Sequence, residues 1–159
     1  MPNRPAGEAD LVPDDTPVES RYERDLYAWA LHQAALIRAG RWNAVDRANV
    51  AEEIESLGRE QYAKLESALR VLLTHMLKWD MQPERRSRSW TLSIKAQRIR
   101  VERIIEQNPG LKSRLSEATV QAYRLARIEA ALETGLEEEK FGTELPYSWN
   151  DIIARDFSV

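Results

Sequence analysis

Two glutamates lie where a predicted helix should bury apolar side chains. Glu129 and Glu133 are four residues apart and fall on the apolar stripe of a helix predicted to end at Gly135. They also lie in the last turns of that helix, where the helix dipole disfavours negative charge, so a cation is expected to face them. Arg98 lies on the apolar arc of the preceding predicted helix and is the expected partner.

Further polar side chains are expected at the same end of the molecule. If short turns make successive helices antiparallel, the start of the third helix lies beside the end of the fourth and the end of the second. We expect this end to gather six candidate site residues: His75, Lys78, Arg88, Trp90, Glu129 and Glu133. The favoured interpretation is an ion-pair network that fixes helix register, since buried charge is costly unless it is paired. The alternative is a polar pocket for a small ligand, or the active site of an enzyme.

The pocket interpretation takes two chemical forms. Arg85, Arg86 and Arg88 precede a predicted helix N-terminus, where guanidinium groups and free N–H groups can together hold a phosphate or carboxylate. His75 with the two glutamates is a donor set that metals use in helical bundles. However, the sequence has neither an HExxH motif nor a pair of Glu-x-x-His motifs. We therefore expect no metal and no cofactor.

The composition restricts the function classes. The chain has 159 residues, of which 43% are hydrophobic and 31% charged, with no cysteine and a net charge of -3. It lacks the roughly 18 consecutive apolar residues of a membrane-spanning helix, so we expect no membrane association. The absence of cysteine fits the cytoplasm. The negative net charge argues against nucleic-acid binding, although residues 78–103 hold eight basic and three acidic residues and are a candidate segment for weak binding.

Apolar periodicity predicts helices throughout the folded part of the chain. Residues 1–19 are proline-rich and acidic and are expected to be a disordered tail, followed by one helical domain over residues 20–159. No segment alternates as a strand would. The predicted fold is all-α: an up-down bundle of four main helices, with a long second helix and a short C-terminal helix.

Particular residues set the expected helix boundaries. Ser20 is expected to cap a first helix that ends at Gly40, and the second helix spans residues 45–79 unless Gly58 breaks it. Ser87 or Ser89 caps the third helix. Boundaries are also expected at Asn108, capping a fourth helix that starts at Pro109 and ends at Gly135, and at Ser148 with Asp151, capping the last helix.

Six short motifs occur in one order and spacing along the chain. They are AEEIESLGR (51–59), LLTHMLKW (72–79), RSRSW (86–90), NPGL (108–111), ETGL (133–136) and PYSW (146–149). Together they resemble the bacterial family known as domain of unknown function twenty-nine, over about Asp25 to Phe157. The resemblance implies an all-helical fold and a bacterial source, but no activity. The chain departs from the expected pattern at Phe141-Gly142 and Leu145-Pro146, where Phe-Pro and Cys-Pro are expected, so any role of a family cysteine is absent.

The first functional hypothesis is a cytoplasmic bacterial interaction or regulatory module. A helix over residues 45–79 spans about 50 Å, and the third helix covers only about half of it. Part of this helix therefore needs the first helix, a protein partner or a second copy of the chain to cover it. The alternatives are the small-ligand site or enzyme described above, and weak nucleic-acid binding through residues 78–103.

Overall fold

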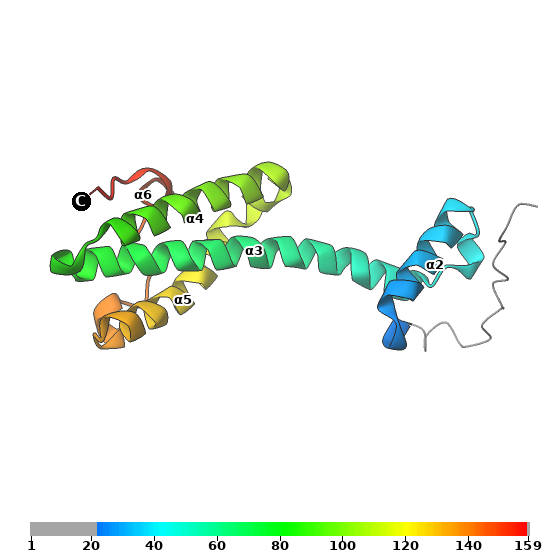
Figure 1. Cartoon of the computed structure of the whole chain (residues 1–159), viewed down its shortest axis with the longest axis horizontal. Coiled ribbons are helices and arrows are strands. Elements are labelled where there is room, and N and C mark those ends of the chain that lie inside the picture. Colours follow the sequence, from blue (N-terminus) through cyan, green and yellow to red (C-terminus); the bar gives the residue numbers. More distant parts are fainter. Residues whose placement is uncertain (1–21, 159) are drawn as a thin grey trace, which may run out of the picture. The chain divides into compact units, whose positions relative to one another are not determined.

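The described chain is entirely helical, which confirms the predicted fold class. The computed structural model describes residues 22–158, and in this range there are helices, turns and no strand. None of these helices is long and apolar enough to cross a membrane. The α-helices shown in Figure 1 are α2 (Leu26–Arg38), α3 (Arg47–Met81), α4 (Arg88–Gln107), α5 (Leu115–Thr134) and α6 (Trp149–Ala154). Short 3₁₀ helices are η1 (Trp42–Ala44), η2 (Pro83–Arg85), η3 (Pro109–Arg114) and η4 (Glu138–Phe141).

The chain groups into two compact units, one up to Glu55 and one from Ser56 onward. In the first unit, the buried side chains of Trp29 and Gln33 on α2 bind the start of α3. The Trp29 indole donates to Asp46 Oδ2 at 3.3 Å, and Gln33 Oε1 accepts from the Asp46 backbone N–H at 2.9 Å. Asp46 also accepts from the Asn49 backbone N–H. The residue that begins α3 thus also holds α2.

The second unit is built around the C-terminal half of α3. Figure 1 shows α4 and α5 flanking this part of α3. The core is a single apolar cluster from four helices and the C-terminal segment. Its fully buried large side chains include Leu65, Leu69, Leu72, Leu73, Met76, Ile94, Tyr123 and Ile152. Ion pairs between residues 70 and 129 and between residues 78 and 133 show that α5 runs parallel to α3.

Several predicted boundaries are confirmed. Gly58 does not break α3, which is continuous over 35 residues. The Ser87 side chain caps α4, and Gly135 ends α5 in the left-handed region at φ 71°. The capping box of Ser148 and Asp151 is present at α6, with both side chains bonded to the partner's backbone N–H.

Two boundary predictions were wrong. The helix predicted to run unbroken from Ser20 is interrupted at Asp25, whose carboxylate accepts from the Ala28 backbone N–H at 2.9 Å and starts α2. The Asn108 side chain does not cap the start of the following helix, because its amide donates to the Ile104 carbonyl at 2.9 Å and caps the C-terminal end of α4 instead. A 3₁₀ helix then precedes α5. Ser20 and the predicted disordered tail lie outside the described residues, and the single domain over residues 20–159 stays a prediction.

Candidate functional site

Three of the six predicted site residues meet where α3, α4 and α5 come together. Lys78, on the last turn of α3, pairs its ammonium with Glu133 on α5. The same ammonium lies 4.8 Å from the centre of the Trp90 ring on α4. The Lys78 side chain is 9% exposed and that of Glu133 is 47% exposed. The cation is therefore almost buried but is neutralised from one side and stacked on an aromatic ring from the other.

Glu129 belongs to a second ion pair two turns away along α3. Its carboxylate pairs with Arg70 and also accepts from Thr74 Oγ1 at 3.2 Å. Sequence analysis did not identify Arg70, although it lies eight residues before Lys78, as expected for a cation on the same side of α3. Both glutamates on the apolar stripe of α5 are thus paired with cations of α3.

The expected pairing of Arg98 with these glutamates was wrong. The Arg98 guanidinium donates to the carbonyls of Ile152 and Asp151 at 2.7 and 3.1 Å. It thereby satisfies carbonyl groups near the C-terminal end of α6. Burial lowers the pKa of Arg98, and the nearby Arg155 charge acts in the same direction.

The remaining predicted site residues, His75 and Arg88, do not join the Lys78 network. His75 Nδ1 lies 2.9 Å from the Val71 carbonyl one turn earlier on its own helix. Arg88 begins α4 and is exposed to solvent. Among the described residues, neither His75 nor Arg88 contacts Lys78 through a hydrogen bond or an ion pair. The six-residue site therefore stays a prediction.

The arginine-rich turn before α4 is partly used by the fold. Arg86 Nε donates to the Trp79 carbonyl at 3.0 Å, and the guanidinium lies 4.9 Å from the centre of the Trp79 ring. Ser87 Oγ accepts from the Trp90 N–H at 3.4 Å, which occupies one of the free N–H groups at the start of α4. Arg86 therefore fastens the turn to the end of α3, which reduces what is left for an anion.

A polar cluster that sequence analysis missed joins α3 to the C-terminal segment. Arg155 donates from Nη1 and Nη2 to the two oxygens of Asp80, at 2.9 and 2.5 Å. The Tyr147 hydroxyl donates to Asp80 Oδ2 at 2.8 Å. Burial, followed by the charge of Asp80 and this hydrogen bond, raises the pKa of Tyr147 far above its usual value. Tyr147 lies in the PYSW motif, so the motif was a signal for this contact.

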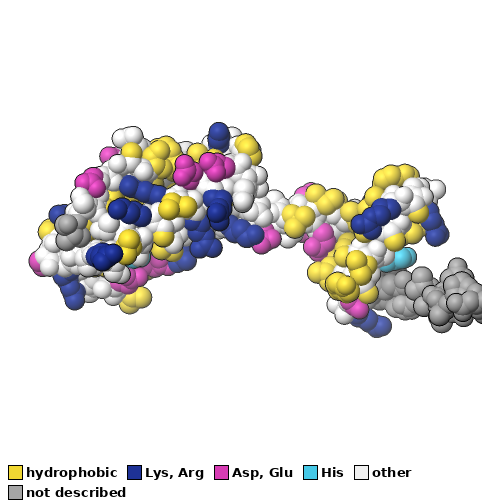
Figure 2. Space-filling view, turned by 45° about the horizontal axis from the view of Figure 1, so that its top comes forward, with side chains coloured by type: hydrophobic (Ala, Val, Ile, Leu, Met, Phe, Trp, Pro, Cys, Tyr) yellow, Lys and Arg dark blue, Asp and Glu magenta, His cyan; other side chains and the backbone are white. Residues whose placement is uncertain are grey.

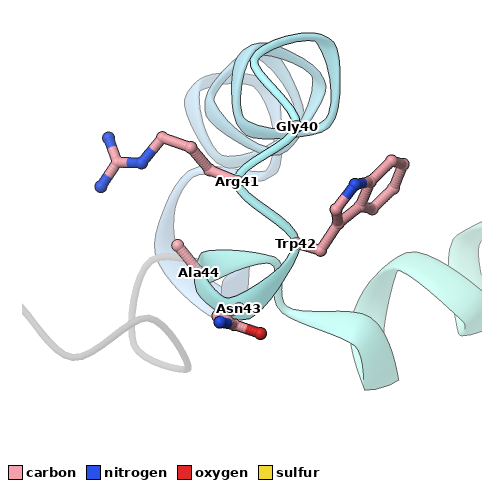
Figure 3. A pocket seen from close by; sticks show the side chains of 5 residues that line it. All are labelled: Gly40, Arg41, Trp42, Asn43 and Ala44. Atoms are coloured by element: carbon pink, nitrogen blue, oxygen red, sulfur yellow. The ribbon is translucent and has the colours of Figure 1, made fainter.

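Two pockets among the described residues are lined by other side chains. One, of about 360 Å³, is formed by the consecutive residues 40–44 after α2. Figure 3 shows the side chains of Arg41 and Trp42 pointing away from each other there, so they do not converge on a ligand. The other, of about 450 Å³, is lined by Lys64 of α3 and by five residues of α4: Ala96, Ile99, Arg100, Arg103 and Ile104. Within residues 22–158, no three His, Asp or Glu side chains are grouped as metal ligands.

The Lys78 network makes an asymmetric prediction for two substitutions. Glu133→Gln is expected to lower the free energy of unfolding by about 1–2 kcal/mol, because it leaves a nearly buried ammonium without its counter-charge. Lys78→Met is expected to cost less, because it keeps the packing against Trp90 and leaves only a half-exposed carboxylate. Urea unfolding measures both, with Glu139→Gln at an exposed position of η4 as the control. A larger loss for Lys78→Met would contradict the structural role of the pair.

A comparison with known proteins finds one family. The family model described as Domain of unknown function DUF29 matches residues 21–158. No curated protein and no solved structure matches the chain.

Proposed function

Because the chain belongs to the family described as Domain of unknown function DUF29, which has no assigned function, we propose a function from the surfaces of the chain. We propose that it is a protein-interaction module that self-associates through α5. The observation that carries this proposal is that large apolar side chains of α5 are left exposed while alanines of the same helix are buried. The buried residues of α5 are four alanines spaced four apart, Ala118, Ala122, Ala126 and Ala130, together with Tyr123, Thr119 and Thr134. The large apolar residues Leu125, Ile128 and Leu132 lie on the outside.

The outward residues of α5 form a row suited to a second helix. Leu125, Ile128 and Leu132 are spaced by three and then four residues, which places them on one stripe. Their exposed fractions are 49%, 50% and 84%. Burial of a fully exposed side chain of this size gives about 1.5–3 kcal/mol, so covering the exposed part of these three side chains favours association.

A second copy of the chain is the occupant that this row fits. A stripe with the 3-4 spacing can pack against an identical stripe through a two-fold axis, so that each copy supplies the same residues to one closed interface. The buried alanines of α5 let this helix approach the core closely.

The long helix α3 is the other candidate location for self-association. Its residues Ile54 and Leu57 are 64% and 62% exposed. They are two apolar positions, whereas α5 offers three in a continuous row. The experiment therefore includes a variant on each helix.

Sedimentation velocity of the full chain tests the proposal. The wild type is expected to sediment as a dimer at micromolar concentration, and Leu132→Glu as a monomer with unchanged helical content, because a charge buried in an apolar interface is not solvated. Ser116→Glu adds the same charge to an exposed position of α5 away from the row, and it is expected to stay dimeric.

Two outcomes would overturn the proposed interface. A monomeric wild type would show that the α5 row is not a self-association surface. Dissociation by Leu57→Glu but not by Leu132→Glu would place the interface on α3 instead.

We also propose a bacterial source and a cytoplasmic location. The bacterial source is supported by the six motifs, and the cytoplasm by a chain of 159 residues without cysteine. A regulatory role would require self-association to change the affinity for a partner, so a Leu132→Glu variant that binds a partner as the wild type does would leave only the interaction role.

A further inference from the structure

The exposed face of α4 alternates positive and apolar side chains. Arg88, Leu92, Lys95, Ile99 and Arg103 follow one another at intervals of three or four residues, so they share one side of the helix. All five are exposed, and Leu92 and Ile99 are exposed over more than half of their surface. We call these five residues the α4 outer face. Figure 2 shows Lys and Arg side chains interleaved with hydrophobic side chains on one face of the second unit, from Ser56 onward.

A groove runs along one edge of the α4 outer face. Ile99 and Arg103 belong to both the face and the groove of about 450 Å³, and Lys64 of α3 and Arg100 of α4 add two more cations to it. Ile104 forms part of its floor and is almost completely buried. The groove thus has an apolar base and a basic rim.

The cations of this surface are not used by the fold. Within residues 22–158, the side chains of Arg88, Lys95, Arg100 and Arg103 have no hydrogen bond or ion pair, while Lys64 pairs with the exposed Glu60 at 2.8 Å. Arg88 also lies on the first turn of α4, where the helix dipole makes a cation unfavourable. Stability of the chain alone does not account for this arrangement.

We propose that the α4 outer face and its groove bind an acidic amphipathic helix of a partner protein. The inference rests on the proposed interaction function and adds the chemistry of the partner. Leu92 and Ile99 are seven residues apart, which is the repeat with which two packed helices bring apolar positions together. Lys95 lies between them. A partner helix with apolar residues seven apart and Glu or Asp between them matches both the apolar and the charged positions.

The same surface is less suited to nucleic acid. Leu92 and Ile99 interrupt the row of cations, and neither the α4 outer face nor the groove contains an aromatic side chain on which a base can stack. Glu102 and Glu106 follow at the end of α4 and would repel a phosphate backbone that continued along the helix. A protein helix can end, or change its charge, at that point.

Fluorescence anisotropy with synthetic peptides tests the inference. The probe is a labelled helical peptide as long as α4, 20 residues, with Leu at every seventh position and Glu at the flanking positions. The full-length chain is expected to bind it and to bind neither the version with Lys in place of Glu nor the version with Ser in place of Leu. Arg103→Glu in the protein is expected to weaken binding about tenfold or more, with affinity falling as salt is raised.

Matched variants separate the named surface from general charge attraction. Lys112→Glu changes the net charge equally at an exposed position outside the α4 outer face and is expected to bind the peptide as the wild type does. Ile99→Ser is expected to weaken binding without a change of charge. Equal effects of Lys112→Glu and Arg103→Glu would overturn the inference.

The nature of the ligand and the proposed self-association are tested separately. Binding of a labelled single-stranded oligonucleotide that is lost in Arg103→Glu, with no peptide binding, would replace the inference by a nucleic-acid interface. The monomeric Leu132→Glu variant is expected to bind the peptide as well as the wild type does. A monomeric wild type that binds the peptide would reject the α5 dimer and retain the α4 surface, whereas a dimer that binds no peptide would do the reverse.

Discussion

Phe157→Ala is expected to lower the free energy of unfolding by about 3–5 kcal/mol, the range for removing a buried aromatic side chain. Phe157 is 4% exposed although only two residues follow it in the sequence. Its ring meets Trp79 edge to face at 5.6 Å, and the guanidinium groups of Arg98 and Arg155 lie 5.1 and 4.9 Å from its centre. The Thr91 hydroxyl donates to its carbonyl at 2.7 Å. The substitution therefore opens a cavity and also removes the aromatic ring that the guanidinium groups of Arg98 and Arg155 contact.

Chemical unfolding followed by circular dichroism measures this loss. Ile153→Ala, four residues earlier and 44% exposed, is the control and is expected to cost less than 1 kcal/mol, on the order of a surface substitution. Phe157→Leu is expected to fall between the two because it keeps most of the apolar volume. A cost for Phe157→Ala no larger than that of Ile153→Ala would show that the C-terminal segment is not part of the cooperative core.

Local sequence signals predicted helix ends well where a side chain and its backbone partner are three or four residues apart. Ser148 and Asp151 form their capping box, and Ser87 caps α4, because both contacts are complete within one turn. Gly135 ends α5 for a similar reason, since its φ of 71° strains other residues. The prediction for Asn108 was wrong because its side chain has a second local partner, the carbonyl of the preceding turn. Asparagine is found at either end of a helix, so the residue type alone does not distinguish the two.

Pairing between helices could not be predicted from helical periodicity. The periodicity placed Glu129 and Glu133 on the side of α5 that meets α3, although Glu133 is half exposed, and it required cations opposite them. It could not choose between Arg98 and Arg70, because the position of a residue on its own helix does not fix which neighbouring helix it meets. Long arginine side chains widen that uncertainty, since one guanidinium can reach several neighbouring elements.

The outward faces of α4 and α5 were predicted in part. The excess of cations in residues 78–103 was visible in the sequence, but their free state and the groove beside them required the structure. On α5, four alanines are buried against the core. What periodicity did not indicate is that the larger Leu125, Ile128 and Leu132 would be left in solvent, because apolar residues on two sides of one helix do not say which side is covered.

Asp80→Ala is expected to lower the free energy of unfolding by about 3 kcal/mol, because it removes three hydrogen bonds to a charged acceptor. Two of these come from Arg155 and one from the Tyr147 hydroxyl. The double variant Asp80→Ala, Arg155→Ala is expected to be less destabilised than the sum of the two single variants, since the second change no longer breaks the pair. Additive losses would contradict a coupled cluster.

The same cluster predicts the direction of a pH dependence. The pKa of Tyr147 is raised in the folded chain, whereas the unfolded value is about 10. The contribution of this proton to the free energy of unfolding is therefore complete below pH 10. It is lost as the pH rises above 10 towards the folded pKa, because the unfolded state releases the proton at a lower pH than the folded state does. Tyr147→Phe is expected to remove this part of the alkaline loss, and Asp80→Asn to reduce it, since burial of the hydroxyl remains but the neighbouring negative charge is gone. Unfolding curves at a series of pH values from 8 to 11 measure the difference, and an alkaline slope that is unchanged in Tyr147→Phe would show that another group causes it.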